Sequence, residues 1–519
     1  MTHNSGSRAE DISGLLESVR SRGVVLWLQG GQLRYRAPKG VLSREELERI
    51  TAYRHEIVGF LQRSAGLYDS AADNQSHPAS NRAPLTFSQL AHWNLYRLAH
   101  RSAIRQVVCA KRLRGRLNVE ALQKSLNSVM QRHDALRTRI VVVDGIPTQV
   151  VSEEAHCEIS IADVTRPWRD SSDSEVQRHI HELIMEPIDL SVGPLFGVRL
   201  LKTANEDHVL IIVMEHMISD AFSIGIVERE LLTGYVQSLL GRPLSLPPVQ
   251  LRFTEYAKRQ RQNDDFLMQK GAEYWRKSLE VCQRTRFPDD VVSPQGRPGW
   301  GELPVRIGSR LKRGLHEWCR REHTTAAIAA LTVYAALVLR WCGVDESVVL
   351  LQVDGRLSSE VENTVGYVSF PLYLRISLRS DDSWRGLLER VTTEYCSAHE
   401  HADFSFMESR IPAPDFTRNT RFNWIPQVGF GEQCLLPGSR DALACSPVPF
   451  IHPMRRELDR DWEPSMQLFE TADEVAGELL FPLSRFSHAS MRKFADNFIL
   501  LMEDLLNQPE GRVADALTG

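Results

Sequence analysis

The stretch "VLIIVMEHMISDAFSIGI", Val209–Ile226, decides how the surrounding part of the chain folds. Its first six residues are all apolar, which is typical of a strand that is buried on both faces. Apolar residues at helical spacing follow from Phe222 onward. Glu215–Ser219 is therefore predicted to be a loop between a strand and a helix, a common place for functional residues in α/β proteins.

The polar residues of this loop are candidates for a catalytic site. His216 lies at the end of the predicted strand, and an imidazole, which titrates near neutrality, suits a general base. Asp220 stands at the predicted helix start, where it can cap the helix or be buried against an arginine that fixes the loop. A lone histidine after a strand is more often a packed or surface residue, so the spacing leaves both interpretations open. The same spacing recurs at His399 and Asp403, where no third ligand is evident, and no metal site is expected.

Length and composition set the class of protein. The 519 residues predict two to four domains, and 42% hydrophobic with 25% charged residues is ordinary for a globular protein. The net charge of −4 gives no indication of nucleic-acid binding. Neither a secretory signal nor an apolar run long enough to span a bilayer is visible. The eight cysteines are scattered without a C-x-x-C pair, which favours reduced thiols and a cytoplasmic location.

The chain is predicted to divide into a small N-terminal unit, a linker and a large body. Residues 10–63 predict a helix, a β-hairpin around Gly30-Gly31 and a second helix with a capping box. Residues 64–84 are rich in Ser, Ala, Asn, Asp and Pro, as in a flexible linker. Strands and helices alternate in the body. Its expected halves are residues 85–253 and 254–515.

The body carries seven short motifs in a fixed order. They are "LTFSQLAHWNLYRL" (85–98), "RHDALRTRI" (132–140), "PIDLSVGPLFGVRLL" (187–201), "MEHMISDAFS" (214–223), "VGYVSFPLYLR" (365–375), "HADFSF" (401–406) and "TRFNWIPQ" (420–427). Together they resemble the motifs of condensation domains in nonribosomal peptide synthetases. The resemblance implies an α/β fold with two chloramphenicol-acetyltransferase-like lobes in a V-shaped pseudo-dimer. Carrier proteins would reach a tunnel between the lobes from its two ends.

The resemblance also implies roles for residues of the fourth motif, which is His-His-x-x-x-Asp-Gly in the family. His216 takes the place of the second, catalytic histidine. Asp220 takes the place of the structural aspartate, whose expected partner is an arginine, and Arg375 is the candidate. Glu215 replaces the first histidine and is expected to face away from the tunnel and support the loop. Ala221 replaces the glycine.

The N-terminal unit has a resemblance of its own. "GVVLWLQGGQLRYRAPKGVLS" resembles the β-hairpin docking domains of the tubulysin-synthetase type. The exposed edge of such a hairpin can accept a partner peptide by β-augmentation. Arg34, Arg36 and Lys39 would then favour an acidic C-terminal tail of the upstream protein. The alternative is that these three charges only keep an edge strand soluble.

The function implied by the resemblance is acyl transfer. An acyl, polyketidyl or peptidyl chain would pass from the thioester of an upstream carrier protein to a hydroxyl or amine, and a downstream acceptor carrier is a second candidate partner. No adenylation or carrier domain is visible, so we expect a freestanding monomer, similar to the chain-releasing condensation enzymes of polyketide assembly lines such as that of enacyloxin. No bound cofactor is expected, because the phosphopantetheine arms belong to the carriers.

Three questions stay open at this point. No residue indicates whether the product is an amide or an ester. Because Glu215 and Ala221 alter the fourth motif, a non-catalytic protein that recruits partner enzymes is an alternative. A plant-type acyl-CoA transferase of the same fold would need Asp-Phe-Gly-Trp-Gly, and "PGWGE" (298–302) matches it only in part.

Overall fold

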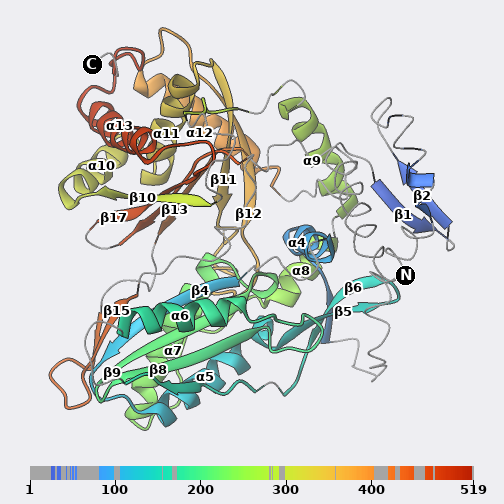
Figure 1. Cartoon of the computed structure of the whole chain (residues 1–519), viewed down its shortest axis with the longest axis vertical. Coiled ribbons are helices and arrows are strands. Elements are labelled where there is room, and N and C mark those ends of the chain that lie inside the picture. Colours follow the sequence, from blue (N-terminus) through green and yellow to red (C-terminus); the bar gives the residue numbers. More distant parts are fainter. Residues whose placement is uncertain are drawn as a thin grey trace, which may run out of the picture. The chain divides into compact units, whose positions relative to one another are not determined.

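The computed structural model describes most of the body and part of the N-terminal unit (Figure 1). The described residues are 25–29, 32–36, 43, 47, 49–51, 53–54, 81–98, 106–154, 156–165, 172–262, 264–279, 282, 285–290, 299–356, 358–402, 419–426, 433–448, 462–471 and 474–516. The chain forms two compact units. One comprises Met1–Pro78 with Phe406–Asp415, and the other comprises Ala79–Ser405 and Phe416–Gly519.

The N-terminal unit contains the predicted β-hairpin. Strands β1 (Val25–Gln29) and β2 (Gln32–Arg36) pair antiparallel, with the last residue of β1 opposite the first residue of β2. The connection therefore has two residues, as the Gly-Gly pair predicts. Further on, the Leu47 N–H donates to the carbonyl of Ser43 (3.1 Å) in the expected second helix. The expected first helix of this unit lies outside the described residues.

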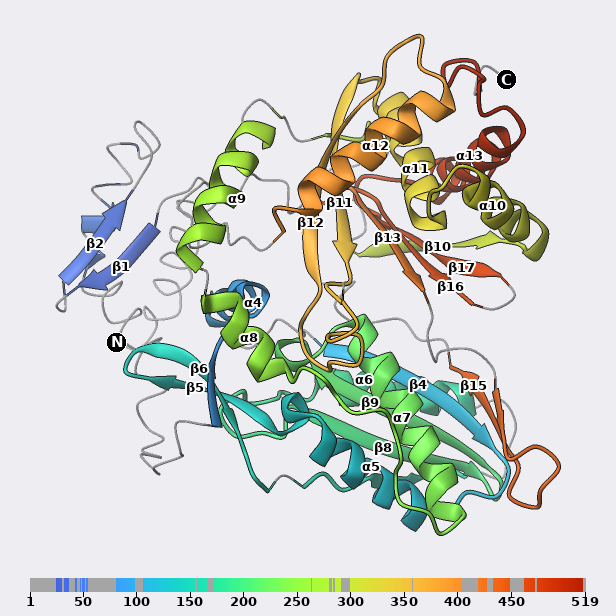
Figure 2. The same cartoon turned by 180° about the vertical axis from the view of Figure 1, so that it is seen from behind.

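The first sheet of the second unit has the strand order β14-β15-β4-β9-β8-β7. The central strand, β9, is buried on both faces, as its apolar run predicts. Val209, Ile211 and Val213 pack into one core cluster with helix α6, while α5 and α7 cover the opposite face (Figures 1 and 2). These elements are β4 (Gln106–Arg114), α5 (Val119–Arg132), β7 (Ser160–Asp163), α6 (Ser172–Met185), β8 (Phe196–Ala204), β9 (Asp207–Glu215), α7 (Ala221–Leu239), β14 (Gln433–Leu435) and β15 (Leu443–Pro447).

A smaller three-stranded sheet, two α-helices and one 3₁₀ helix adjoin this layer. The sheet has the order β3-β6-β5. The carboxylate of Asp134 accepts hydrogen bonds from the backbone N–H groups of Phe253 (3.2 Å) and Thr254 (3.1 Å), which caps α8. The elements are β3 (Arg82–Pro84), α4 (Phe87–Leu98), the 3₁₀ helix η2 (Asp134–Arg137), β5 (Thr138–Val143), β6 (Ile146–Val151) and α8 (Phe253–Gln262). Helix α9 (Asp264–Leu279) follows α8, and its Trp275 indole N–H donates to the His401 carbonyl (2.9 Å).

The second six-stranded sheet has the order β10-β17-β16-β13-β11-β12. Helices α10 to α13 lie over one of its faces (Figure 2), and α11 is buried along most of its length. No single described helix meets the length and hydropathy of a membrane span; only α10 and α11 counted together, bent by 104°, do so. The elements are β10 (Trp300–Ile307), α10 (Ser309–Arg321), α11 (Ala326–Cys342), β11 (Glu346–Val353), β12 (Phe370–Ser377), α12 (Trp384–His399), β13 (Arg421–Pro426), β16 (Ser465–Glu470), β17 (Val475–Pro482) and α13 (His488–Asn507).

The two sheets do not divide the chain at residue 253, the boundary expected from the sequence. β14 and β15 come from the second half of the chain but join the first sheet, where β15 pairs antiparallel with β4. The register places Ala444 opposite Arg114 and Pro447 opposite Lys111. The edge of β4 is thus covered by a strand that lies more than 300 residues further along the chain.

Candidate active site

The predicted strand-to-helix loop is present, and His216 is its first residue. β9 ends at Glu215, a single 3₁₀ turn η3 (His216–Ile218) follows, and α7 begins at Ala221. The buried Glu215 fixes the turn through its backbone, because its N–H donates to the Leu195 carbonyl (2.8 Å) and its carbonyl accepts from the Ser219 hydroxyl (3.0 Å). The backbone of the loop is therefore held on both sides of His216.

Asp220 caps α7 and forms a buried ion pair. Its carboxylate accepts from the Ser223 N–H (2.7 Å), as a helix N-cap does. Both carboxylate oxygens also face the guanidinium of Arg356, at 3.0 and 3.1 Å. The side chains of Asp220 and Arg356 are only 1% and 3% exposed. The arginine belongs to the loop that follows β11, so the pair joins the two halves of the second unit.

The expectation that Arg375 would be the partner of Asp220 is wrong. Arg375 forms a half-exposed ion pair with Glu346 (2.8 Å). β11 and β12 are antiparallel, so Arg375, five residues into β12, lies beside the first residues of β11. At about 3.4 Å per residue this is roughly 17 Å along the strand from the loop that Asp220 contacts. Arg356, which follows the last residue of β11, lies at the correct end.

Asp220 also holds the segment before β12. Its Oδ2 accepts from the backbone N–H groups of Val368 (3.1 Å) and Ser369 (3.0 Å). Burial alone would raise the pKa of Asp220, but the charge of Arg356 and the donors of Ser223 hold this pKa below its ordinary value. Asp220 is thus an ionised link between the His216 loop and residues 366–369.

Three rings meet at His216. The His92 ring stacks on it, with centroids 4.7 Å apart and planes 28° apart. The Tyr367 ring lies 4.4 Å from His216 and 4.9 Å from His92. His92 comes from α4, His216 from η3 and Tyr367 from the segment before β12. We call these three residues the ring cluster.

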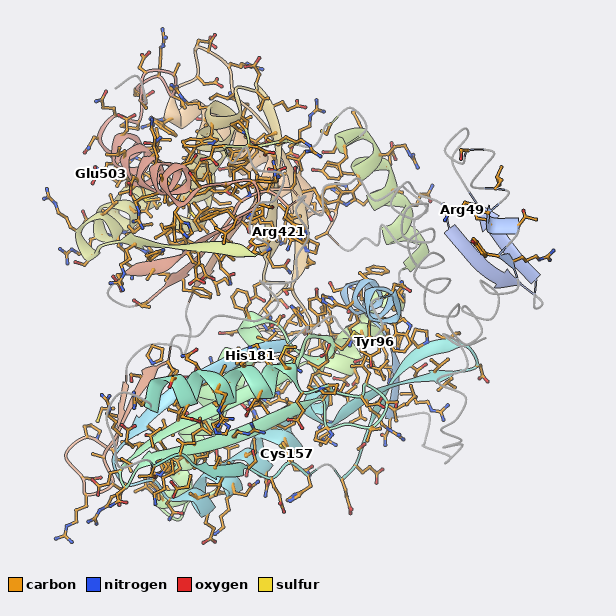
Figure 3. All side chains as sticks on the ribbon, in the orientation of Figure 1. Arg49, Tyr96, Cys157, His181, Arg421 and Glu503 are labelled. Carbon is orange, nitrogen blue, oxygen red and sulfur yellow. The ribbon has the colours of Figure 1, made fainter. Side chains whose placement is uncertain are left out.

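The first turn of α4 forms hydrogen bonds with η3 and with the segment before β12. The Gln89 side chain donates to the Met217 carbonyl of η3 (2.7 Å) and to Gln149 of β6 (3.1 Å). The Ser88 hydroxyl donates to the Ser369 carbonyl (3.0 Å). His92 lies four residues after Ser88 and three residues after Gln89, so it projects from the same face of the helix. α4, which carries Tyr96 in Figure 3, therefore borders the site together with η3 and the segment before β12.

A partly buried charge comes from the second sheet. Arg421 of β13 (Figure 3) stacks over the Trp462 ring at 4.5 Å. Burial lowers the pKa of Arg421 to about 10, and electrostatic interaction with Tyr373 and Tyr367 partly opposes this shift. Arg421 thus acts electrostatically on Tyr367, whose ring lies 4.4 Å from His216.

The remaining candidates are the second His-x-x-x-Asp pair and the docking residues. His399 lies at the end of α12 beside the rings of Phe370 (5.8 Å) and Tyr395 (5.6 Å), whereas Asp403 is outside the described residues. Among the residues that the structure describes, no group of three or more His, Cys, Asp or Glu side chains has the arrangement of a metal site. For the docking surface, Arg34 and Arg36 lie on β2, but their side chains and the whole of Lys39 fall outside the description.

Sequence reasoning missed Arg356, His92 and Tyr367. Arg356 stands in "VDGRL" directly after a strand, which was the available signal for its position at the sheet end. His92 and Tyr367 stand within the first and fifth motifs. Nothing in their local spacing indicates that their rings meet at His216.

The chain belongs to the condensation-domain family. Residues 79–518 match the Condensation domain, and residues 12–63 match the TubC N-terminal docking domain. The chain is 27% identical over 439 residues to the beauvericin nonribosomal cyclodepsipeptide synthetase of Beauveria bassiana; this match covers 83% of the chain but only 14% of that much longer protein. A chondramide synthase of Chondromyces crocatus is 26% identical over 450 residues, with 84% of this chain and 11% of that protein covered. The predicted family and fold are thus confirmed.

Solved structures share the fold at low identity. The X-domain from teicoplanin biosynthesis, solved in complex with OxyB, has a TM-score of 0.67 and 22% identity, and the match covers 85% of this chain and 96% of that chain. SgcC5 from Streptomyces globisporus, in complex with an aryl ethanediol and sucrose, has a TM-score of 0.63 and 22% identity, with 83% of this chain and all of that chain covered. At this identity they establish the fold alone.

Proposed function

We propose that the chain is an acyltransferase that moves an acyl, polyketidyl or peptidyl chain from a carrier-protein thioester to a hydroxyl or amine, with His216 as the general base. The observation that carries the proposal is the way His216 is held. Its loop is fixed by backbone hydrogen bonds at Glu215 and by the buried Asp220–Arg356 pair. A group placed this firmly is suited to aligning a nucleophile.

The proposed reaction needs only groups of the chain and the two substrates. The acceptor O–H or N–H gives its proton to the His216 imidazole while the oxygen or nitrogen attacks the thioester carbonyl. The tetrahedral intermediate then collapses, the C–S bond breaks, and the imidazolium returns the proton to the departing thiolate of the phosphopantetheine arm. General-base assistance of this kind is worth about 10²–10⁴-fold in rate.

The finer proposal is chain release by transfer to a free acceptor. A hydroxyl depends on a base more heavily than an amine does, because an amine can attack before it loses its proton. The altered fifth motif, with Phe370 and Pro371 where Asn and Thr are usual, supports an atypical substrate. The diol in the SgcC5 structure makes hydroxyl acceptors a reasonable choice for the panel described below.

A docking role is proposed for the N-terminal unit. The match to the TubC docking domain and the β1–β2 hairpin support the capture of an acidic peptide from the upstream protein. Arg34, Arg36 and Lys39 are the proposed contacts.

The second candidate function is a scaffold that binds partner enzymes without catalysis. Two observations favour it: the altered residues Glu215 and Ala221, and the likeness to an X-domain that was solved in complex with OxyB. Retention of His216 within a firmly bonded loop favours catalysis.

The test is intact-mass spectrometry of a loaded carrier protein mixed with the full chain and a panel of amines and alcohols. We expect the acyl mass to leave the carrier and to appear on one class of acceptor, which also distinguishes ester from amide formation. His216→Gln should slow this transfer by about 10²–10⁴-fold, whereas His181→Gln, on the exposed face of α6, should not. Carrier binding without transfer to any acceptor would instead support the scaffold.

A further inference from the structure

Tyr367 brings an aromatic ring into the site from the segment before β12. It is only 7% exposed, and its ring centroid lies 4.4 Å from that of His216, with the two planes tilted by 52°. The Tyr367 ring also contacts His92, at 4.9 Å. Because His92 itself lies 4.7 Å from His216, the three centroids form a nearly equilateral triangle. The imidazole of His216 therefore has an aromatic neighbour on two sides.

The backbone on both sides of Tyr367 is held by residues at the start of α7. On one side, the Gly366 N–H donates to the Ser223 hydroxyl (3.0 Å). On the other side, the N–H groups of residues 368 and 369 donate to the Asp220 carboxylate (3.1 and 3.0 Å). The Tyr367 ring can withdraw from the imidazole only if these bonds break.

The hydrogen bonds described for the His216 loop hold its backbone. The side-chain torsions of His216 are a separate freedom, and the outer one is broad and roughly two-fold for a histidine. A general base has to bring one ring nitrogen within hydrogen-bond reach of the proton that it accepts. The orientation of the imidazole is thus a second requirement of the proposed mechanism, beyond the position of the loop.

Building on the proposed function, we propose that Tyr367 is a positioning residue whose ring holds the imidazole of His216 in the orientation that receives the acceptor's proton. The role belongs to the ring, which packs against the imidazole, and not to the hydroxyl. A misplacement of about 1 Å at a reacting group can cost about 10²-fold in rate. Loss of the ring should therefore lower kcat and leave the KM of the acceptor nearly unchanged.

The connections around Tyr367 form a closed circuit. The chain leads from His216 to Asp220 and Ser223, hydrogen bonds lead from these two residues to the segment 366–369, and the Tyr367 ring returns to His216. The residues that fix the end of the catalytic loop thus also fix the ring against its side chain.

The first test compares Tyr367→Leu with Tyr367→Phe in the full chain, with the loaded carrier and the acceptor that the mass-spectrometric experiment identifies. Leucine keeps an apolar side chain but removes the planar ring, so we expect kcat to fall by about 10–10²-fold. Phenylalanine keeps the ring, and its kcat should stay within about threefold of the unchanged chain. The matched control is Tyr373→Leu. Tyr373 is also 7% exposed, but its ring lies against Trp275 (6.1 Å), so kcat should change by less than about threefold.

The second test introduces Tyr367→Leu into a chain that already carries His216→Gln. A residue that acts through His216 has nothing left to position there, so the remaining transfer rate should not fall further. A second drop of the same size as in the unchanged background would show a merely structural role and overturn the proposal.

The third test needs no turnover. It follows the ¹³Cε1–¹H resonance of His216 in the histidine-labelled full chain, assigned by its loss in His216→Gln, with all variants in one buffer. We expect the resonance to move and broaden in Tyr367→Leu, because the neighbouring ring is gone and the imidazole samples several orientations. In Tyr367→Phe it should stay close to its original position.

Two results would contradict the role of the ring. One is a His216 resonance that is unchanged in Tyr367→Leu, and the other is an equal loss of kcat in Tyr367→Leu and Tyr367→Phe, which would assign the role to the hydroxyl. Absence of transfer in the unchanged chain would reject the proposed function, and the resonance would still decide whether Tyr367 holds the imidazole.

Discussion

Replacement of Asp220 by asparagine tests the central link of the site. The change is nearly isosteric but removes the charge that faces Arg356, and both side chains are at most 3% exposed. Removal of one partner of a buried ion pair costs about 3–5 kcal/mol when the remaining charge is left unpaired. Arg356 keeps a second carboxylate, Asp354, at 2.6 Å, so the cost lies at the lower end of this range. Asparagine also has to turn an NH₂ group toward one of the N–H donors of Ser223, Val368 or Ser369. We therefore expect a loss of about 3 kcal/mol in the free energy of unfolding.

This free energy converts into a measurable melting temperature. The condensation region, residues 79–518, has about 440 residues. An unfolding entropy of about 2.1 cal/mol/K per residue then gives about 0.9 kcal/mol/K, so the Tm should fall by about 3 °C. The assay is differential scanning calorimetry at pH 7, accompanied by the acyl-transfer rate, which should also fall because residues 366–369 are no longer tied to the His216 loop.

Arg375→Met is the matched control. It removes an arginine from the half-exposed pair with Glu346, and such pairs contribute about 0–1 kcal/mol. Its Tm should change by no more than about 1 °C. Equal shifts for Asp220→Asn and Arg375→Met would refute the assignment of Arg356 as the partner that matters.

The same link has a defined pH dependence. The folded pKa of Asp220 lies below its unfolded value, so the stabilisation is fully present above the unfolded pKa and is lost as the pH falls through the folded pKa. The difference in Tm between the unchanged chain and Asp220→Asn should be constant from about pH 8 to about pH 5 and should shrink below about pH 4.

Three further predictions concern other parts of the chain. Deletion of residues 1–63 should slow transfer from the native carrier but spare a small-molecule thioester, and an equal loss with both donors would show that this unit belongs to the catalytic body. Lys111→Met should lower the free energy of unfolding by about 3–5 kcal/mol, because the carboxylate of Glu228, which pairs with Lys111 at 3.0 Å, stays buried without its partner. The double replacement Lys111→Met/Glu228→Leu should leave this free energy unchanged or raise it, as measured by urea unfolding. Gly366→Ala should lower both the Tm and the transfer rate, because a Cβ at this position would lie 2.2 Å from the ring of Phe253. In the control Gly308→Ala the new Cβ has no neighbour within 4 Å, so both quantities should stay unchanged.

Local patterns predicted the elements that carry the site. The apolar run before Glu215 specifies a strand that is buried on both faces. The polar turn after it leads directly into the helix that Asp220 caps. The Gly-Gly pair likewise predicts a two-residue hairpin connection, which the register of β1 and β2 confirms. In each case the determinants lie within about ten residues of one another.

Partners that lie far apart in the sequence were not predictable in this way. Whether Asp220 meets Arg356 or Arg375 depends on the direction and register of β11 and β12, which neither residue reveals. The stacking of His92 on His216 depends on bonds from Ser88 and Gln89 to two other elements. The three- and five-residue strands β14 and β15 are too short to produce a period-2 signal that assigns them to a sheet.

The pairing of β15 with β4 has a consequence for anyone who builds hybrid assembly-line proteins from this chain. A chimera that exchanges everything after residue 253 also exchanges the strand that seals the first sheet. If the incoming strand fits poorly, the peptide groups of β4 become an open template for other chains, and the hybrid aggregates even though both halves come from well-folded parents. Crossover points should therefore keep residues 433–447 with the half of the molecule whose sheet they complete.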